Sequence, residues 1–184
     1  MNVLTERKAK AGTITGAPCL KTDWQTPEHL LDCVRDYFGG PIPLDPATSP
    51  GNPTKALEFF TEEDDGLSWD WHPQAFVNPP YGKAIRQWLM GTAQQATNDA
   101  EIIALLPCAR WEQGYFHDFL DHVDALCFIR KRVSFVNPKT GDRVNGNPYA
   151  NMFAGLNTDW SRFVRAFSPV GWCVRLGERR RNYE

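Results

Sequence analysis

The residues best suited to chemistry are four consecutive ones, Asn78-Pro79-Pro80-Tyr81, which follow a short apolar run at residues 75–77. The two prolines fix two φ angles and remove two backbone donors, so the loop leaves a strand rigidly. The side-chain carbonyl of Asn78 and the backbone carbonyl of Pro79 can then stand side by side as acceptors. Two acceptors suit an amine on an aromatic ring, because accepting both N–H hydrogens favours the pyramidal amine with a free lone pair. Tyr81 offers an aromatic face on which the ring can stack.

An α/β fold would hold this loop at the carboxyl end of a strand, where the ligands of open sheets bind. Thr26-Pro27-Glu28 predicts a helix start, with Thr26 as the N-cap and Pro27 at the first helical position. Apolar spacing predicts helices over about 28–38, behind the loop from Ile85, and around 115–120. The predicted strands cover residues 41–44, 56–60, 75–77, 101–106, 125–136 and 152–156.

Strands that alternate with helices from residue 40 to 125 predict a mostly parallel sheet with helices on both faces. The late strands without a helix between them indicate an antiparallel edge. A length of 184 residues with 42% hydrophobic content fits one domain. We expect residues 1–21 to form a mobile arm, and residues 22–184 to form a single domain with a recognition loop around 137–151.

Composition excludes several classes of protein. The five cysteines are scattered without a C-x-x-C pair, which is typical of reduced cysteines in a cytoplasmic protein. No apolar run reaches eighteen residues, so neither export nor membrane insertion is expected. No metal is expected either, because His117 and His122 would face different sides of a helix. The net charge of −2 hides an acidic run at 62–65 and basic runs at 130–132 and 179–181.

The loop and its surroundings resemble a known family. Asn-Pro-Pro-Tyr matches the catalytic motif of amino methyltransferases that act on adenine N6 or cytosine N4, and protein-glutamine methyltransferases share it. The surrounding segments resemble, in order, the phage-encoded Dam-type DNA N6-adenine methyltransferase family. These segments are Asp23-Trp24-Gln25-Thr26-Pro27, Leu44-Asp45-Pro46-Ala47, Asp65-Gly66-Leu67 and Phe76-Val77. The resemblance spans about residues 23–156. It implies a Rossmann-like class I S-adenosylmethionine-dependent methyltransferase that methylates N6 of a flipped-out adenine in DNA.

The resemblance also implies cofactor contacts. It assigns Trp24, Thr26 and Pro27 to the methionine end of S-adenosylmethionine, where the N–H groups of a helix start suit a carboxylate. Asp45 could bind the ammonium group, although Pro46-Ala47 and the following residues replace the glycine-rich turn that is usual there. Asp64 or Asp65 with Leu67 would border the adenine, and Asn78 would lie at the cofactor as well. For the acid that binds the ribose, the sequence offers Glu58, Glu62 and Glu63 and does not choose among them.

Cations and polar side chains near the loop are candidates for DNA contacts, because a flipped base requires phosphate contacts that offset its unstacking. The candidates for phosphate contacts are Lys83, Arg86, Arg110 with Trp111, and Arg130 and Arg132, which would alternate on one strand face. In the recognition loop, Asn145, Asn147 and Tyr149 are side-chain types that read or stack on bases.

Other functions stay open at this point. The same loop would serve cytosine N4 or the amide of a protein glutamine. A nucleic-acid-binding protein of methyltransferase fold that does not catalyse or does not bind cofactor is a further alternative, which the unusual turn after Asp45 leaves open. The sequence implies no obligatory protein partner. It leaves open the recognition sequence, the preference for single or double strands and the oligomeric state.

Overall fold

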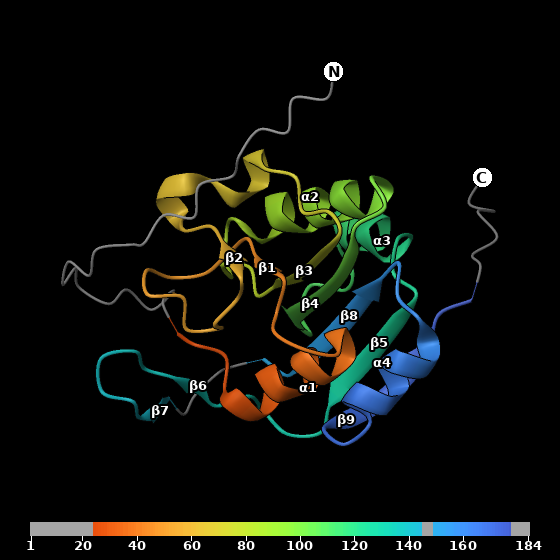
Figure 1. The fold of residues 1–184 in the computed structure, drawn as a ribbon. Coiled ribbons are helices and arrows are strands. Elements are labelled where there is room, and N and C mark those ends of the chain that lie inside the picture. The colour runs from red at the N-terminus through yellow and green to blue at the C-terminus, as the bar shows by residue number, and fades with distance from the viewer. Residues whose placement is uncertain (1–23, 145–148, 178–184) are drawn as a thin grey trace.

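The computed structural model describes residues 24–144 and 149–177, in which a central sheet has helices on both faces (Figure 1). The helices are α1 (Glu28–Phe38), α2 (Ile85–Thr97), α3 (Gly114–Leu120) and α4 (Trp160–Phe167). The strands are β1 (Leu44–Asp45), β2 (Glu58–Phe59), β3 (Gln74–Val77), β4 (Glu101–Pro107), β5 (Ala125–Ile129), β6 (Phe135–Val136), β7 (Arg143–Val144), β8 (Asn151–Leu156) and β9 (Gly171–Arg175). The predicted arm at 1–21 lies outside the described residues, as does part of the predicted recognition loop.

The central sheet has the strand order β3-β4-β8-β5-β9 and is mixed. β3 and β4 pair in parallel, whereas β8 runs antiparallel to both β4 and β5, and β9 runs antiparallel to β5. The predicted mostly parallel sheet is therefore corrected to a mixed one. The reason is that β8 enters the sheet between β4 and β5, which point the same way but are not neighbours. The expected antiparallel late strand is confirmed, but it lies inside the sheet and not at its edge.

The residues of β4 show how the sheet faces its helices. Side chains alternate along a strand, so every second residue points to the same face. Ile102, Ala104 and Leu106 belong to the core under α2 and α3. Ile103 and Leu105 belong to the core under α1 and α4. A strand buried on both faces reads as a continuous apolar run, which is why residues 101–106 were predictable as a strand.

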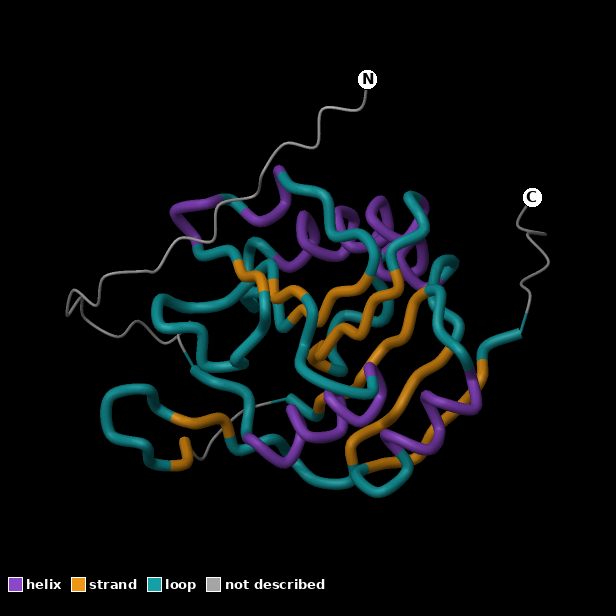
Figure 2. Tube along the Cα trace, viewed as in Figure 1, coloured by secondary structure: helices purple, strands orange, loops and turns teal. Residues whose placement is uncertain are grey.

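β1 and β2 form a separate parallel pair next to the central sheet. Leu44 pairs with Glu58 and Asp45 with Phe59, and β1 contacts β3. Both strands are shorter than the sequence predicts. Figure 2 shows that the chain between β1 and β3 is mostly loop with short helical turns. β1 therefore ends in loop structure beside the strand that leads to Asn78.

The start of α1 differs from the prediction. Pro27, with φ −60° and ψ 142°, is the N-cap, and its carbonyl accepts from the backbone N–H of Leu30 and Leu31. No side chain caps this helix end. Thr26 therefore lies one residue outside the helix, and its hydroxyl is available for a contact elsewhere. The expected stop is confirmed, because Gly39 adopts the left-handed conformation with φ 74°.

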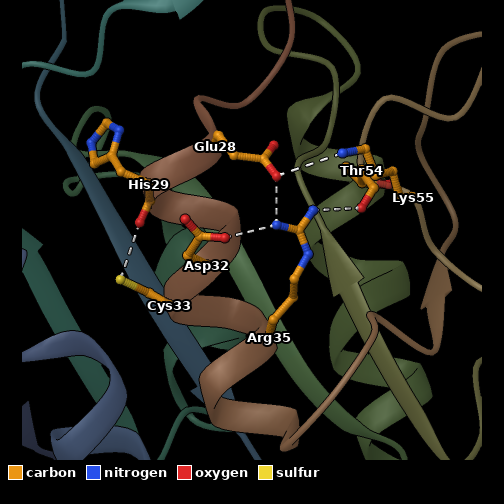
Figure 3. A network of polar contacts seen from close by, with 7 residues as sticks. All are labelled: Glu28, His29, Asp32, Cys33, Arg35, Thr54 and Lys55. Carbon is orange, nitrogen blue, oxygen red and sulfur yellow. Dashed lines mark hydrogen bonds and ion pairs between the residues drawn. The ribbon is translucent and has the colours of Figure 1, made fainter.

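A polar network ties α1 to the loop after β1 (Figure 3). Arg35 donates to the carboxylates of Glu28, at 2.8 Å, and Asp32, at 2.9 Å. Its second terminal nitrogen donates to the backbone carbonyl of Thr54 at 3.2 Å. Lys55 approaches Glu28 at 3.8 Å. The network holds the helix against the segment that begins at Asp45.

A second network joins α1 and α4 to the end of the sheet opposite the Asn-Pro-Pro-Tyr loop. Glu101, the first residue of β4, accepts from the Tyr37 hydroxyl at 2.5 Å and from Arg162 at 2.6 Å. The Arg162 guanidinium also lies 5.0 Å from the centre of the Tyr37 ring. The other carboxylate oxygen of Glu101 accepts from the side-chain amide of Gln74. These contacts fix both helices of one face relative to β3 and β4.

The last part of the chain departs most from the prediction. The strand predicted over 125–136 is two elements, because β5 ends at Ile129 and β6 begins at Phe135. The backbone N–H of Arg130 bonds to the Val170 carbonyl, just outside β9. The helix α4 and the strand β9 were not predicted. Arg130 and Arg132 consequently do not alternate on a strand face, and that expectation is wrong.

Candidate active site

The Asn-Pro-Pro-Tyr loop lies between two predicted elements that the structure confirms, β3 and α2. β3 is almost fully buried, and Val77 at its end is 0% exposed. Pro79 is buried, whereas Asn78, Pro80 and Tyr81 are partly exposed. The loop therefore emerges from the core and presents its side chains near the surface, as its two prolines predict.

The nitrogen of the Asn78 side-chain amide has a hydrogen-bond partner, whereas its oxygen has none in the described residues. Its Nδ2 donates to the hydroxyl of Thr26 at 3.2 Å. Its Oδ1 is buried and has no hydrogen-bond partner among residues 24–144 and 149–177. Buried carbonyl oxygens are usually paired, because an unpaired one loses the hydrogen bonds of water. An acceptor in this state suits a donor that arrives with a ligand.

Tyr81 is held by a residue that sequence reasoning missed, Asn151. This asparagine is 0% exposed at the start of β8, and its Nδ2 donates to the Tyr81 hydroxyl at 2.8 Å. Burial raises the pKa of Tyr81 above its usual value, so its hydroxyl stays protonated and neutral. The ring meets Phe135 edge-on, with centroids 6.2 Å apart. A polar residue at the start of an otherwise apolar strand is the signal that could have revealed Asn151.

Phe135 joins Tyr81 to Trp24, which the sequence assigns to the cofactor. The Trp24 and Phe135 rings lie 6.4 Å apart. The residues that follow them in the chain, Gln25 and Val136, form two backbone hydrogen bonds with each other, each of 2.9 Å. The structure thus brings Trp24, Thr26 and the loop together, with β6 as their common support.

Asp45 is buried at the end of β1, and its carboxylate faces its own loop. One oxygen accepts from the Ala47 backbone N–H at 3.0 Å, and the other accepts from the Thr54 hydroxyl at 2.8 Å. Only 2% of the residue is exposed. Burial raises the pKa of the carboxyl from 3.8 to about 6, against the opposing effect of these hydrogen bonds. The contacts fix the turn at Pro46 and Ala47.

The segment from Asp64 to Leu67 lies against this turn. An added Cβ at Gly66 would meet the Pro46 carbonyl oxygen at 1.9 Å, so only glycine allows the close approach. Leu67 packs on α2 at Gly91, where an added Cβ would meet its side chain at 2.5 Å. Two segments that the sequence assigns to the cofactor are therefore adjacent.

The acids of this segment contact their own backbone and neighbours. Asp64 accepts from the Thr61 backbone N–H at 3.0 Å and from the Thr61 hydroxyl at 2.8 Å. Asp65 adopts the left-handed conformation with φ 48° and accepts from the Ser68 hydroxyl. Glu58, Glu62 and Glu63 are exposed. Nothing in these contacts selects one of them as the acid that binds a ribose.

A small pocket, partly open to solvent, adjoins the loop. Its lining is Tyr81, Gly82, Ile85, Leu89, Leu106, Pro107, Ala109, Arg110, Tyr115, Phe116 and Tyr149. Three of the predicted site residues, Tyr81, Arg110 and Tyr149, are therefore brought together. Asn78 is not in the lining, so the pocket lies on the Tyr81 side of the loop.

The residues predicted to contact phosphates follow the carboxyl ends of β3, β4 and β5, which all point the same way. Lys83, Arg110, Arg130 and Arg132 are exposed. Arg86 lies over the Tyr115 ring at 6.0 Å. Trp111 is partly exposed and packs against the core, with its ring 4.9 Å from that of Phe116 and 6.1 Å from that of Phe128. Asn145 and Asn147 lie outside the described residues.

The part of the chain that the structure describes has neither a membrane-spanning helix nor a cluster of metal-ligating side chains. No helix there is long and apolar enough to cross a membrane. No group of three or more His, Cys, Asp or Glu side chains there is arranged to hold a metal ion.

The sequence profile of one protein family matches most of the chain. It is the family described as DNA N-6-adenine-methyltransferase (Dam), and the match covers residues 17–171. No curated protein matches the sequence. The matched range contains the Asn-Pro-Pro-Tyr loop together with Thr26, Asp45 and Asn151. The chain therefore belongs to the DNA N-6-adenine-methyltransferase (Dam) family.

Proposed function

We propose that this protein transfers the methyl group of S-adenosylmethionine to the exocyclic N6 of an adenine flipped out of DNA. The single observation that carries the proposal is the Oδ1 atom of Asn78, an acceptor that is buried and has no partner in the described chain. It lies next to Pro79, whose backbone carbonyl is the second acceptor in the proposal. Membership of the family supports adenine over cytosine as the base.

Three residues of the loop take part in the proposed reaction. Asn78 Oδ1 and the Pro79 carbonyl accept the two hydrogens of the amine, which leaves its lone pair free to attack. The ring of Tyr81 supports the flipped base by stacking, a contact worth about 1–3 kcal/mol. The protonated Tyr81 hydroxyl takes no proton from the amine, since burial keeps its pKa high. The surplus proton leaves to water.

The proposed cofactor site is formed by three segments next to the loop. S-adenosylmethionine supplies an activated methyl group on a positively charged sulfur when it is bound. Trp24, Pro27 and the backbone of Thr26 would hold its methionine end, because the Thr26 hydroxyl contacts Asn78. The turn at Asp45, Pro46 and Ala47, with Asp64, Asp65 and Leu67 beside it, would hold the remainder. Gly66 packs closely against Pro46, which supports the proposal that the two segments together form one wall of the cofactor site.

We also propose that residues 22–184 form a Rossmann-like class I methyltransferase domain. The arrangement of the strands supports this fold. β1 carries Asp45 and contacts β3, which carries Asn78 at its end. Ligands of open α/β sheets bind at the carboxyl ends of such neighbouring strands.

Charge is separated along the strands in a way that supports DNA contact at the same edge. The exposed cations Lys83, Arg110 and Arg130 follow the carboxyl ends of β3, β4 and β5. The exposed acids Asp99 and Asp124 precede β4 and β5 at the opposite edge. We propose that these three cations contact the phosphates of DNA bound at the edge that carries Asn78.

The direct test is to identify the methylated product. The protein is incubated with radiolabelled S-adenosylmethionine and unmethylated DNA, and the DNA is digested to nucleosides. We expect the label on N6-methyl-2′-deoxyadenosine. Label on 4-methylcytosine or on protein would overturn the substrate assignment. Calorimetric titration with S-adenosylmethionine tests the cofactor separately, and the absence of binding at millimolar concentration would overturn the enzyme assignment.

A further inference from the structure

The contact between Thr26 and Asn78 joins two parts of the chain that are anchored independently. Gln25, just before Thr26, is bonded to Val136 of β6, and Pro27, just after it, is the N-cap of α1. Asn78 is fixed by β3 on one side and by Pro79 on the other. Thr26 is 7% exposed, so water has little access to its hydroxyl. The bond of 3.2 Å therefore connects two fixed points.

An asparagine amide has two ends of nearly equal shape and opposite chemistry. Its oxygen accepts hydrogen bonds, and its nitrogen donates them. If the amide turned by 180°, an N–H would face the N–H of the substrate amine, and the amine would lose an acceptor. Rotation of the amide plane by a smaller angle would also misdirect Oδ1. The proposed reaction therefore needs a contact that holds the amide plane.

We infer that Thr26 is a positioning residue whose hydroxyl holds Asn78 Nδ2, so that Oδ1 faces the amine that is methylated. This inference rests on the proposed function. It differs from the expected role of Thr26 at the cofactor carboxylate, because the structure directs the hydroxyl to Asn78. It also explains why Thr26 does not cap α1, since its hydroxyl contacts the loop across the gap between helix and strand.

The inference extends to the rest of α1. The helix is held against the loop after β1 by Arg35, which bonds the Thr54 carbonyl at 3.2 Å. Thr54 in turn donates its hydroxyl to Asp45. A chain of contacts thus runs from the turn at Asp45 through α1 to Thr26 and Asn78. The same helix positions the proposed cofactor turn and the proposed methyl-acceptor site.

The test compares Thr26→Val, which keeps the shape and removes the hydroxyl, with Thr26→Ser, which keeps the hydroxyl. We expect kcat for DNA methylation to fall about tenfold in Thr26→Val, equivalent to about 1.4 kcal/mol. In Thr26→Ser it should stay within about threefold of the starting protein. The dissociation constant of S-adenosylmethionine, measured by calorimetry, should stay within about threefold in both variants.

The outcomes separate positioning from the other roles of Thr26. An unchanged kcat in Thr26→Val at saturating cofactor, with weakened cofactor binding, would show a cofactor ligand and overturn the inference. A similar fall in both variants, with a lower unfolding temperature, would show a purely structural role and also overturn it. If the unaltered protein binds cofactor but methylates no DNA, the proposed function fails and the inference with it. An active protein with an unaffected Thr26→Val variant overturns the inference alone.

Discussion

The Asn-Pro-Pro-Tyr loop and the segment from Asp45 to Leu67 both carry polar side chains next to the proposed site, but they use them differently. In the loop, Asn78 keeps one end of its amide tied to Thr26 and the other end without a partner in the described chain. In the segment, the carboxylates of Asp45 and Asp64 accept hydrogen bonds from nearby backbone and hydroxyl groups. The loop therefore offers a side-chain atom to a ligand, whereas the segment uses its side chains to shape a wall.

This difference indicates which atoms should respond to mutation. Where a side-chain atom contacts the substrate, removing it should lower the rate and leave the fold intact. Where side chains hold the backbone, changing them should alter stability first and binding only through the shape of the wall.

The substitution Asn78→Ala should lower kcat by at least about a hundredfold, because it removes an acceptor that acts at the reacting amine. Cofactor affinity should change by no more than a few fold. Nucleoside analysis and calorimetry measure the two quantities. Methylation at the original rate would contradict the mechanism. The substitution Asn98→Ala, outside the site at the end of α2, serves as a control.

The substitution Gly66→Ala should lower the free energy of unfolding by about 1–3 kcal/mol, because the new methyl group meets the Pro46 carbonyl oxygen. Cofactor affinity should fall with it, since the turn at Pro46 must move. Urea denaturation and calorimetry provide the measurements. The matched control is Gly114→Ala, where an added Cβ meets nothing within 4 Å. Equal stability of both variants would contradict the close packing of Gly66 against Pro46.

Asp45 gives a prediction that depends on pH. Its pKa is raised to about 6 by burial, so ionisation is easier in the unfolded chain than in the folded one. The contribution of Asp45 to the free energy of unfolding is greatest below about pH 4. It falls as the pH rises to about 6 and stays constant above that pH. Asp45→Asn should remove this fall and increase stability at pH 7 by about 1–3 kcal/mol.

Denaturation of the Asp45→Asn variant between pH 4 and pH 8 measures this effect, with Asp118→Asn on the exposed side of α3 as the control. Cofactor affinity should stay within a few fold if the carboxylate only fixes the turn. A loss of more than tenfold would show that the carboxylate itself binds the cofactor, and the contrast between the two regions would then be wrong.

The substitution Tyr81→Phe should have the smallest effect. It keeps the aromatic face and removes the acceptor for Asn151, which is fully buried. We expect a loss of about 1 kcal/mol in stability and a kcat within a few fold of the original. Thermal unfolding and nucleoside analysis measure both. A large fall in kcat without a change in stability would assign the hydroxyl a part in the reaction.

Local sequence signals predicted the part of the fold that carries the loop. The apolar run of β3, the two prolines and the periodic face of α2 each depend on neighbouring residues, so they could be read without the structure. The strand order of the central sheet could not be predicted from such local signals. The position of β8 between β4 and β5 depends on contacts between distant segments, and this position made the sheet mixed.

The same limit applies to the site. Thr26 was read as an N-cap because of its local sequence, but its hydroxyl contacts Asn78, 52 residues later. Asn151 supports Tyr81 from a distance of 70 residues along the chain. By contrast, α4 could have been predicted from its local sequence. Asp159 caps it by accepting from the Arg162 backbone N–H, and Phe163 and Phe167 are spaced for one buried face.

The antiparallel direction of β8 has a consequence for how new specificities could arise. The neighbouring strands β4 and β5 finish at the edge that carries Asn78, whereas β8 begins there, with Asn151 next to Tyr81. Tyr149 and Ala150, the described residues just before β8, therefore lie at this edge, and Tyr149 lines the pocket beside Tyr81. Exchanges at these two positions need not change any strand pairing. We propose that the preference for the sequence around the methylated base can vary here without a change in the sheet.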